Sequence, residues 1–240
     1  SLFLLDKNAE IAMIEECSQY FKGIHIHYSK NITELFEYCD MAITVGGDGT
    51  IIHAAKYAAK ADKQLIGVNV GRLGFAADVE PHEYEQLERL ITGEVIKEDG
   101  SKHYLAVNDA VVARGQLSKT IDLHLTLDGD EISKYRADGL LFATPTGSTA
   151  YSLSAGGPIL APKMECILMT PVCPHSLFSR SVLFSGESEL SVHVKIPEEC
   201  CCVLTIDGEK NVSVLATDRV VIRKSDLKLK LALLHNRNFY

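Results

Sequence analysis

A short apolar run that ends in a cluster of glycines constrains the fold of this chain more than any other feature. Residues 41–45, Met-Ala-Ile-Thr-Val, are typical of a buried strand, and residues 46–50, Gly-Gly-Asp-Gly-Thr, follow directly. After them, Ile51, Ile52 and a series of alanines recur at helical spacing. The sequence therefore predicts a strand, a tight corner and a helix in succession. We call residues 46–50 the glycine corner.

The chemistry of the glycine corner suits a phosphate group. Backbone N–H groups and the positive end of a helix attract anions there, and glycine lets the backbone approach a ligand closely. We therefore predict Gly46, Gly47, Gly49 and Thr50 as phosphate-binding residues. Asp48 is the exception, because a carboxylate repels phosphate. It belongs there if it binds a metal or takes a proton; alternatively, it only caps a plain Gly-Asp-Gly turn.

Strand and helix patterns alternate over the first 92 residues, which predicts an α/β domain with an open, mostly parallel sheet. The predicted strands are 2–5, 24–28, 41–45 and 65–70, and the predicted helices are 8–22, 31–38, the helix after residue 50, and 80–92. Ligands bind beyond the carboxyl ends of strands in such sheets, where the glycine corner falls. Arg72 follows the 65–70 strand, so it is either a further phosphate contact or a loop cap.

The pattern changes after about residue 93, where short strand-like runs recur between turn signals. The predicted strands are 103–107, 110–113, 121–127, 132–136, 140–143, 190–196, 202–206, 212–215 and 219–223. Asp128-Gly129 lies between two apolar runs and predicts a hairpin. We therefore expect domains at 1–92 and 93–225, the second being β-rich and mainly antiparallel. The alternating run at 228–234 predicts that residues 226–240 return to the first domain.

The bulk composition excludes several classes of protein. The net charge is -8 and no basic cluster stands out, so we expect no nucleic-acid binding. Seven cysteines, an odd number without a C-x-x-C pair, argue against a disulfide framework and against a zinc site. We expect a reducing, cytoplasmic setting and no membrane insertion, since neither a signal peptide nor an apolar stretch of membrane length is apparent.

Residues 135–159 interrupt the rhythm of strands in the second half. This segment carries an acid, several hydroxyl side chains close together and glycines around an aromatic residue. Such a surface can hydrogen-bond ribose and base edges, and its glycines allow a close approach of the backbone. The alternative is an ordinary loop rich in serine and threonine.

Four features occur together in an order and spacing that closely resemble the bacterial NAD kinases over nearly the whole chain. They are the glycine corner, the pair Asn108-Asp109, the segment 135–159, and residues 205–208, Thr-Ile-Asp-Gly. The resemblance implies an α/β amino-terminal domain and a β-rich carboxyl-terminal domain whose last strand crosses back. It also implies transfer of the terminal phosphoryl group of ATP, or of polyphosphate in some members, to the 2′-hydroxyl of the adenosine ribose of NAD.

The resemblance implies roles for individual residues. Asp48 resembles the catalytic aspartate, Asp138 the acid at the nicotinamide end, and Asp207 a strand aspartate that often reaches the site across a subunit interface. Arg136 corresponds to a contact with phosphate or a neighbouring subunit, and Thr149, Ala150 and Tyr151 correspond to the adenine side. The complete set of implied NAD-binding residues is Asp48, Gly49, Asn108, Asp109, Arg136, Asp138, Thr146, Thr149, Ala150, Tyr151 and Asp207.

The sequence departs from the family pattern at three positions. Asp109 stands where a glutamate is usual, Ala76 where a leucine is usual, and Glu209 where many members have glutamine. The aspartate is one methylene shorter than glutamate. Its reach toward a ligand is therefore shorter.

The implied cofactor is Mg²⁺, or another divalent cation, bound to ATP. Because no P-loop lysine is present, this cation would neutralise the phosphates, held by them and by water rather than by a dedicated protein cage. The implied assembly is a homodimer or homotetramer. Two other functions stay open: a lipid kinase of the diacylglycerol or sphingosine type that shares the corner, and a non-catalytic NAD(H) sensor.

Overall fold

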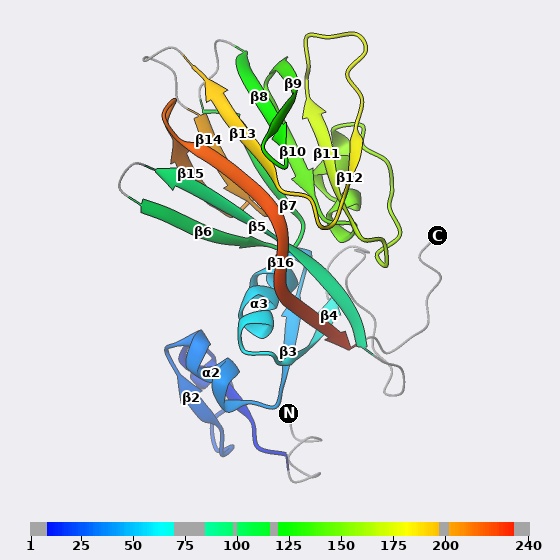
Figure 1. The fold of residues 1–240 in the computed structure, drawn as a ribbon. Helices are drawn as coiled ribbons and strands as arrows, with labels where there is room; N and C mark the ends of the chain where they lie inside the picture. Colours follow the sequence, from blue (N-terminus) through cyan, green and yellow to red (C-terminus); the bar gives the residue numbers. More distant parts are fainter. Residues whose placement is uncertain (1–8, 70–84, 98–99, 116–119, 197–201, 233–240) are drawn as a thin grey trace. The chain divides into compact units, whose positions relative to one another are not determined.

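The computed structural model describes residues 9–69, 85–97, 100–115, 120–196 and 202–232 (Figure 1). The chain divides into two compact units. The first unit comprises Ser1–Leu87 and Leu229–Asn238, and the second comprises Glu88–Lys228 and Phe239–Tyr240. Strand predictions at 2–5 and the predicted phosphate contact Arg72 lie outside the described residues.

The first unit contains the predicted α/β arrangement. Its elements are β1 (Ala12–Ile14), the 3-10 helix η1 (Glu15–Tyr20), β2 (His27–Ser29), α2 (Ile32–Tyr38), β3 (Met41–Gly46), α3 (Asp48–Lys60) and β4 (Gln64–Asn69). β3 pairs with β4 in parallel, β4 pairs in parallel with the end of β16 (Arg219–Ala232), and β1 pairs in parallel with β2. α3 packs against β3 and β4, and its buried face consists of Ile51, Ala54, Ala55, Ala58 and Ala59.

Two predicted helices of this half are wrong. Within 8–22, residues Ala12–Ile14 form β1 and only Glu15–Tyr20 are helical, as a 3-10 helix. Of the helix predicted at 80–92, residues from Glu85 onward belong to β5 (Glu85–Lys97), and residues 80–84 lie outside the described part. β5 pairs with β6 (Gly100–Ala106) and with β16, and such sheet hydrogen bonds override a weak local helix preference.

The second unit is built from antiparallel strands in two sheets. One sheet has the order β12-β11-β10-β7-β14-β15, and the other continues from β16 through β13 and β8 to β9. The strands not yet given are β7 (Asp109–Arg114), β8 (Ile121–Leu127), β9 (Asp130–Ala137), β10 (Gly139–Ala143), β11 (Cys166–Val172), β12 (Val182–Ser185), β13 (Leu190–Lys195), β14 (Cys202–Ile206) and β15 (Lys210–Val214).

Most strands of this unit were predicted, but β5, whose larger part belongs to it, and two further strands were not. The prediction at 121–127 matches β8, and Asp128-Gly129 turns the chain into β9 with positive φ at both residues. Strands β11 and β12 were missed. The runs at 219–223 and 228–234 were predicted as separate strands. They instead belong to one continuous strand, β16, as far as residue 232.

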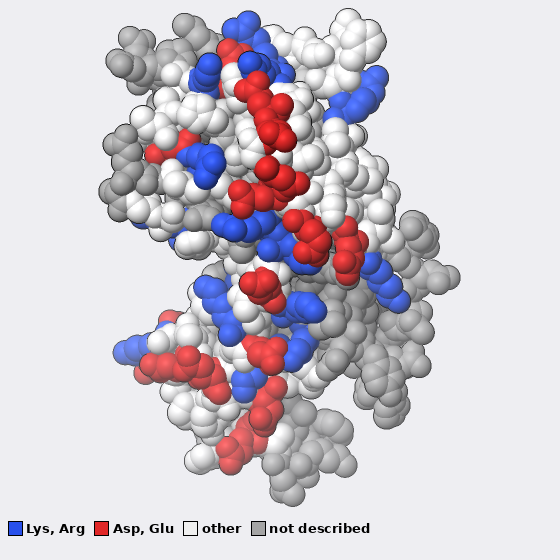
Figure 2. Space-filling model, in the orientation of Figure 1, with Lys and Arg blue, Asp and Glu red and all other residues white. Residues whose placement is uncertain are grey.

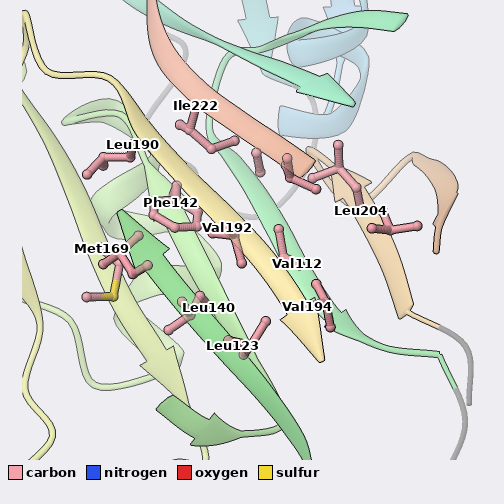
Figure 3. Close-up of a cluster of buried hydrophobic side chains, with 14 of the residues drawn as sticks. Val112, Leu123, Leu140, Phe142, Met169, Leu190, Val192, Val194, Leu204 and Ile222 are labelled. Carbon is pink, nitrogen blue, oxygen red and sulfur yellow. The ribbon is translucent and has the colours of Figure 1, made fainter. Parts of the chain in front are cut away.

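The two sheets of the second unit enclose one apolar core. Alternate residues of β8 and β13 point toward alternate residues of β7, β10, β11 and β14, as Figure 3 shows. The period-2 alternation along β8 places Ile121, Leu123 and Leu125 inside, all at most 3% exposed. Phe142 on β10 is fully buried in this cluster.

The segment after β10 covers the opposite face of the six-stranded sheet. This segment runs through the 3-10 helix η2 (Thr146–Thr149) and α4 (Tyr151–Ser154), and its Leu160 packs with Leu141, Ala143 and Leu168. All five residues of β10 are therefore buried. The strand is enclosed by the main core on one face and by this segment on the other.

We predict that Phe142→Ala lowers the free energy of unfolding by about 3–5 kcal/mol, because it removes a large buried side chain and leaves a cavity. Urea denaturation followed by circular dichroism measures the change. Ile132→Ala on β9 is the matched control, since Ile132 is 44% exposed and truncation there should change stability by less than about 0.5 kcal/mol. Equal losses in the two variants would contradict the assignment of Phe142 to the core.

Candidate functional site

The glycine corner joins β3 to α3 as predicted. β3 ends at Gly46, Gly47 is the residue before the helix, and Asp48 is the first helical residue. No side chain caps the start of α3, and the first bonds of the helix run from the Thr50 and Ile51 N–H groups to the Gly47 carbonyl oxygen. The N–H groups of Asp48 and Gly49 precede these bonds, so they can serve an external acceptor.

The glycines of the corner differ in what surrounds them. A Cβ on Gly46 would lie 2.5 Å from Thr50 Oγ1, so glycine is needed there for the chain to fold back on Thr50. No heavy atom would lie within 4 Å of a Cβ on Gly47 or Gly49. Asp48 itself is exposed. The corner thus presents accessible backbone N–H groups next to an exposed carboxylate. A phosphate can approach the N–H groups, and a sugar hydroxyl can approach the carboxylate.

A carboxylate in the second unit holds three consecutive backbone N–H groups. Asp207 Oδ2 accepts a hydrogen bond from the Val107 N–H at 3.0 Å, and Oδ1 accepts from the N–H groups of Asn108 and Asp109 at 2.7 and 3.1 Å. In return, the Asp207 N–H donates to the Asp109 carbonyl oxygen at 2.9 Å. We call this set of bonds the Asp207 clamp. It fixes the backbone at the pair Asn108-Asp109.

The carbonyl side of the same backbone is held by the segment that follows β10. The Thr144 N–H donates to the Asn108 carbonyl oxygen at 2.9 Å, and Thr144 Oγ1 donates to the Val107 carbonyl oxygen at 2.8 Å. The same hydroxyl accepts the Gly147 N–H at 2.9 Å. A Cβ on Gly147 would lie 1.9 Å from the Asn108 oxygen, so only glycine permits this approach.

Residues 144–152, which we call the hydroxyl loop, are held mostly by their own side chains. Buried Ser148 accepts the Leu160 N–H at 3.0 Å, and Thr149 Oγ1 donates to the Thr146 carbonyl oxygen at 3.1 Å. Thr149 and Ala150 are half-buried, and the neighbouring Tyr151 is 48% exposed. The loop therefore offers a fixed backbone with an accessible aromatic side chain beside it.

Asp109 is the most perturbed acid of the site. It is only 4% exposed, and burial together with the nearby charge of Asp207 raises the pKa of its carboxyl group to about 7. The larger cause is burial, which disfavours the charged form. Near neutral pH this carboxyl group can therefore either donate or accept a hydrogen bond.

Asp138 occupies the opposite end of β10 from the hydroxyl loop. Its carboxylate forms a two-point ion pair with Arg114, at 2.7 Å to Nε and 3.1 Å to Nη2. Sequence reasoning missed Arg114, because nothing local marks it; only the antiparallel pairing of β7 and β10 brings it to Asp138. Six residue steps along an extended chain separate Asp138 from Thr144, which is about 20 Å at about 3.3 Å per residue.

Arg136 lies on β9, in the other sheet of this unit, two residues before Asp138. It forms an ion pair with Asp122 at 3.3 Å and is largely exposed. An open groove of about 590 Å³ beside it is lined by basic, aromatic and hydroxyl side chains, among them Lys134, Phe178 and Arg180. The Arg136 carbonyl oxygen accepts the His175 N–H at 2.8 Å, which anchors the segment that forms the other wall.

The predicted site residues of the second unit thus form two groups. Asn108, Asp109 and Asp207 lie with the hydroxyl loop, which contains Thr146, Thr149, Ala150 and Tyr151. Asp138 lies at the other end of β10, and Arg136 lies two residues before it, on β9 of the other sheet. Within the described residues, no grouping of three His, Cys, Asp or Glu side chains suited to a metal ion is found. None of the helices in the described part of the chain combines the length and apolarity that crossing a bilayer requires.

Comparison with known families gives matches along most of the chain. The model of the ATP-NAD kinase N-terminal domain matches residues 8–95, and the model of the ATP-NAD kinase C-terminal domain matches residues 107–234. The NAD kinase of Marinobacter nauticus is 36% identical over 253 residues, covering 99% of this chain and 85% of that protein. The NAD kinase of Cellvibrio japonicus is 39% identical over 220 residues, covering 86% and 73%.

Solved structures agree with this relationship. Yeast NADH kinase complexed with NADH matches with a TM-score of 0.85 at 26% identity, over 98% of this chain and 76% of that one. An NAD kinase from Archaeoglobus fulgidus in complex with ATP shares the fold with a TM-score of 0.75 at 24% identity, over 97% and 96% of the two chains.

The raised pKa of Asp109 predicts an unusual dependence of stability on pH. The folded chain keeps this proton up to about pH 7, whereas the unfolded chain loses it near 3.8, so ionising Asp109 disfavours the folded state. The loss of stability that this ionisation causes is absent below pH 3.8, grows as the pH rises, and is complete above about pH 7. Asp109→Asn should therefore gain stability relative to the wild type between these values, by a total on the order of 4 kcal/mol.

Urea denaturation at a series of pH values between 4 and 8 measures this difference. Asp130→Asn is the control, because Asp130 is exposed at the start of β9. We expect its stability difference from the wild type to stay nearly constant over the series. A constant difference for Asp109→Asn as well would contradict the raised pKa.

Proposed function

Because the chain belongs to the ATP-NAD kinase family, we infer that it transfers the terminal phosphoryl group of ATP to the 2′-hydroxyl of the adenosine ribose of NAD, giving NADP. The observation that carries this function is the match of both family models, in order, to the two parts of one chain. Nothing supports either alternative. On the face in Figure 2, acidic and basic side chains are interspersed, unlike the basic surface that a membrane-bound lipid kinase would need.

We propose Asp48 as the catalytic residue. A ribose hydroxyl is a weak nucleophile at neutral pH, and phosphoryl transfer depends mainly on positioning and on stabilising charge. A carboxylate that accepts a hydrogen bond from the 2′-hydroxyl aligns its oxygen with the phosphorus and takes the proton as the new bond forms. The exposure of Asp48 at the first turn of α3 supports this role, since the carboxylate is accessible and its backbone is fixed.

The donor phosphates would bind at the open backbone of the glycine corner. The N–H groups at the start of α3 and the helix dipole attract negative charge, and the bare Cα atoms of Gly47 and Gly49 leave room for phosphate oxygens. Gly46 and Thr50 keep the corner folded. Asp48 opposes this attraction with its own charge, so we propose that the donor arrives as a Mg²⁺ complex. Arg72 and the use of polyphosphate stay predictions.

The surface around the Asp207 clamp is the proposed site for NAD, within a NAD-binding domain at 93–225. Asn108 offers an amide and Asp109 a carboxyl group that can donate or accept near neutral pH, and both suit ribose hydroxyls. Thr146, Thr149, Ala150 and Tyr151 would contact the adenine side, with the exposed tyrosine ring available for stacking. Gly49 would lie against the sugar beside Asp48.

We also propose that the active form is a homodimer or homotetramer. Asp138 and Arg136 are expected NAD contacts, yet Asp138 lies about 20 Å along β10 from the hydroxyl loop, and Arg136 is two residues before Asp138 in the chain. A second copy of the chain could supply them to a site built mainly by the first. A cytoplasmic location stays a prediction, supported by the odd number of cysteines.

Replacing the catalytic carboxylate gives the most direct test. We expect Asp48→Asn to lower kcat by about 10²–10⁴-fold, because the amide is nearly the same size but cannot accept the proton. Binding of NAD should persist. NADP formation from NAD, ATP and Mg²⁺ is followed by coupling to an NADP-specific dehydrogenase, and NAD binding is measured by isothermal titration calorimetry.

Asp40→Asn is the matched control, since Asp40 is an exposed aspartate just before β3 in the same unit. It should keep wild-type turnover. If Asp48→Asn were also fully active, another group would have to act on the hydroxyl. A wild-type protein that binds NAD but makes no NADP would instead support the sensor alternative.

A second prediction concerns the divalent cation. Excess chelator should abolish NADP formation, because the donor phosphates would then meet Asp48 without charge compensation. Adding back Mg²⁺ should restore the activity. Undiminished turnover in chelator would show that the protein neutralises the phosphates by itself.

A further inference from the structure

We propose that Asp207 is a positioning residue that fixes the NAD-binding backbone and does not itself contact NAD. This inference rests on the proposed function of Asn108 and Asp109 as NAD contacts. The family resemblance alone would place Asp207 among the ligand contacts. The geometry of its carboxylate points to a different role, as a support beneath the residues that meet the ligand.

The carboxylate of Asp207 is already committed to the chain's own backbone. Both of its oxygens accept hydrogen bonds, from the N–H groups of Val107, Asn108 and Asp109 at 2.7–3.1 Å. Bonds to a charged acceptor are stronger than those between neutral groups, and each N–H would otherwise need another partner. An Asp207 that turned to a ligand would leave three adjacent N–H groups unsatisfied.

The backbone turn that contains Asp207 is compatible with this positioning role. Its φ is +49° and that of Gly208 is +69°, and the Glu209 N–H donates to the Ile206 carbonyl oxygen at 3.0 Å. This is a tight hairpin turn between β14 and β15 in which glycine would be least strained. Asp-Gly is a common pair in such turns, as at Asp128-Gly129, and here the turn brings the Asp207 carboxylate to the backbone of residues 107–109.

The clamp also connects the two halves of the proposed NAD surface. Asp207 holds the N–H side of residues 107–109, while Thr144 holds the carbonyl side through Asn108 and Val107. Gly147, in the hydroxyl loop, packs directly against the Asn108 backbone. Loss of the carboxylate would therefore loosen Asn108, Asp109 and the start of the hydroxyl loop together.

The charge of Asp207 has a further consequence for its neighbour. Among the described residues, Asp207 is the ionisable group whose charge adds to burial in raising the pKa of Asp109. Neutralising Asp207 should lower the pKa of Asp109. A support that acted through shape alone would not have this effect.

The chain offers a closely matched control for the test. Asp128 precedes Gly129 in the hairpin between β8 and β9, and these two residues have φ values of +51° and +97°. Its carboxylate also accepts a backbone N–H, that of Glu189 at 2.9 Å, but on the other sheet. Asp207→Gly and Asp128→Gly therefore remove the same side chain from the same kind of turn.

Hydrogen exchange in the protein without NAD separates support from contact. We expect Asp207→Gly to speed exchange of the amides of Val107, Asn108 and Asp109, because each loses its acceptor. Asp128→Gly should leave these amides unchanged. Wild-type exchange at residues 107–109 in Asp207→Gly would overturn the proposal. This measurement needs no activity, so it remains decisive even if the proposed function fails.

Steady-state kinetics supply the second readout. Asp207→Gly should raise KM for NAD by about 10–100-fold, since the NAD contacts of Asn108 and Asp109 are misplaced rather than removed, and should leave KM for ATP nearly unchanged.

Asp207→Asn keeps the shape of the side chain and serves as the test variant if Asp207→Gly does not fold. It should move the pH dependence of KM for NAD to lower pH, following Asp109. An unchanged pH profile together with an unchanged KM for NAD would refute the role.

Discussion

The burial of β10 on both faces is the constraint on which the rest of the second unit depends. A strand of five enclosed residues has no solvated face, so its neighbours must cover it completely. The opposing sheet covers one face, and the segment containing the hydroxyl loop covers the other. This segment must therefore fold back immediately after Ala143, and the tight return through Thr144 and Gly147 follows from that requirement.

Polar groups gather where the enclosed strands end. The start of β7, the end of β10 and the end of β14 meet at one edge, because these strands are antiparallel neighbours in register. Backbone groups at such an edge lose their ladder partners and need others. Asp207 and Thr144 provide them, one as an acceptor and one as both donor and acceptor. The same bonds that complete the fold thereby shape the surface proposed to bind NAD.

The sequence alone predicted those features whose cause is local. The glycine corner was readable because strand, glycines and helix follow one another within twenty residues, and β8 was readable from its alternation. β5 was not, since its strand state depends on pairing with β6 and β16. The Asp207 clamp could not be predicted either, because about a hundred residues separate its partners. The resemblance to the NAD kinases identified Asp207 as important, but only the fold shows what its carboxylate binds.

Four aspartates of the chain show how one side chain takes different roles according to its surroundings. Asp48 is exposed at the start of a helix, where a carboxylate stays accessible to a substrate. Asp138 is paired with the Arg114 guanidinium, and Asp207 accepts hydrogen bonds from three backbone N–H groups.

Asp109 is buried near the charge of Asp207, and these two causes raise the pKa of its carboxyl group to about 7. A glutamate there would place its charge one methylene farther from the backbone that carries the Asp207 clamp. The shorter acid keeps its charge close to that of Asp207, so the strength of NAD binding in this chain should depend on pH through the proximity of these two carboxylates.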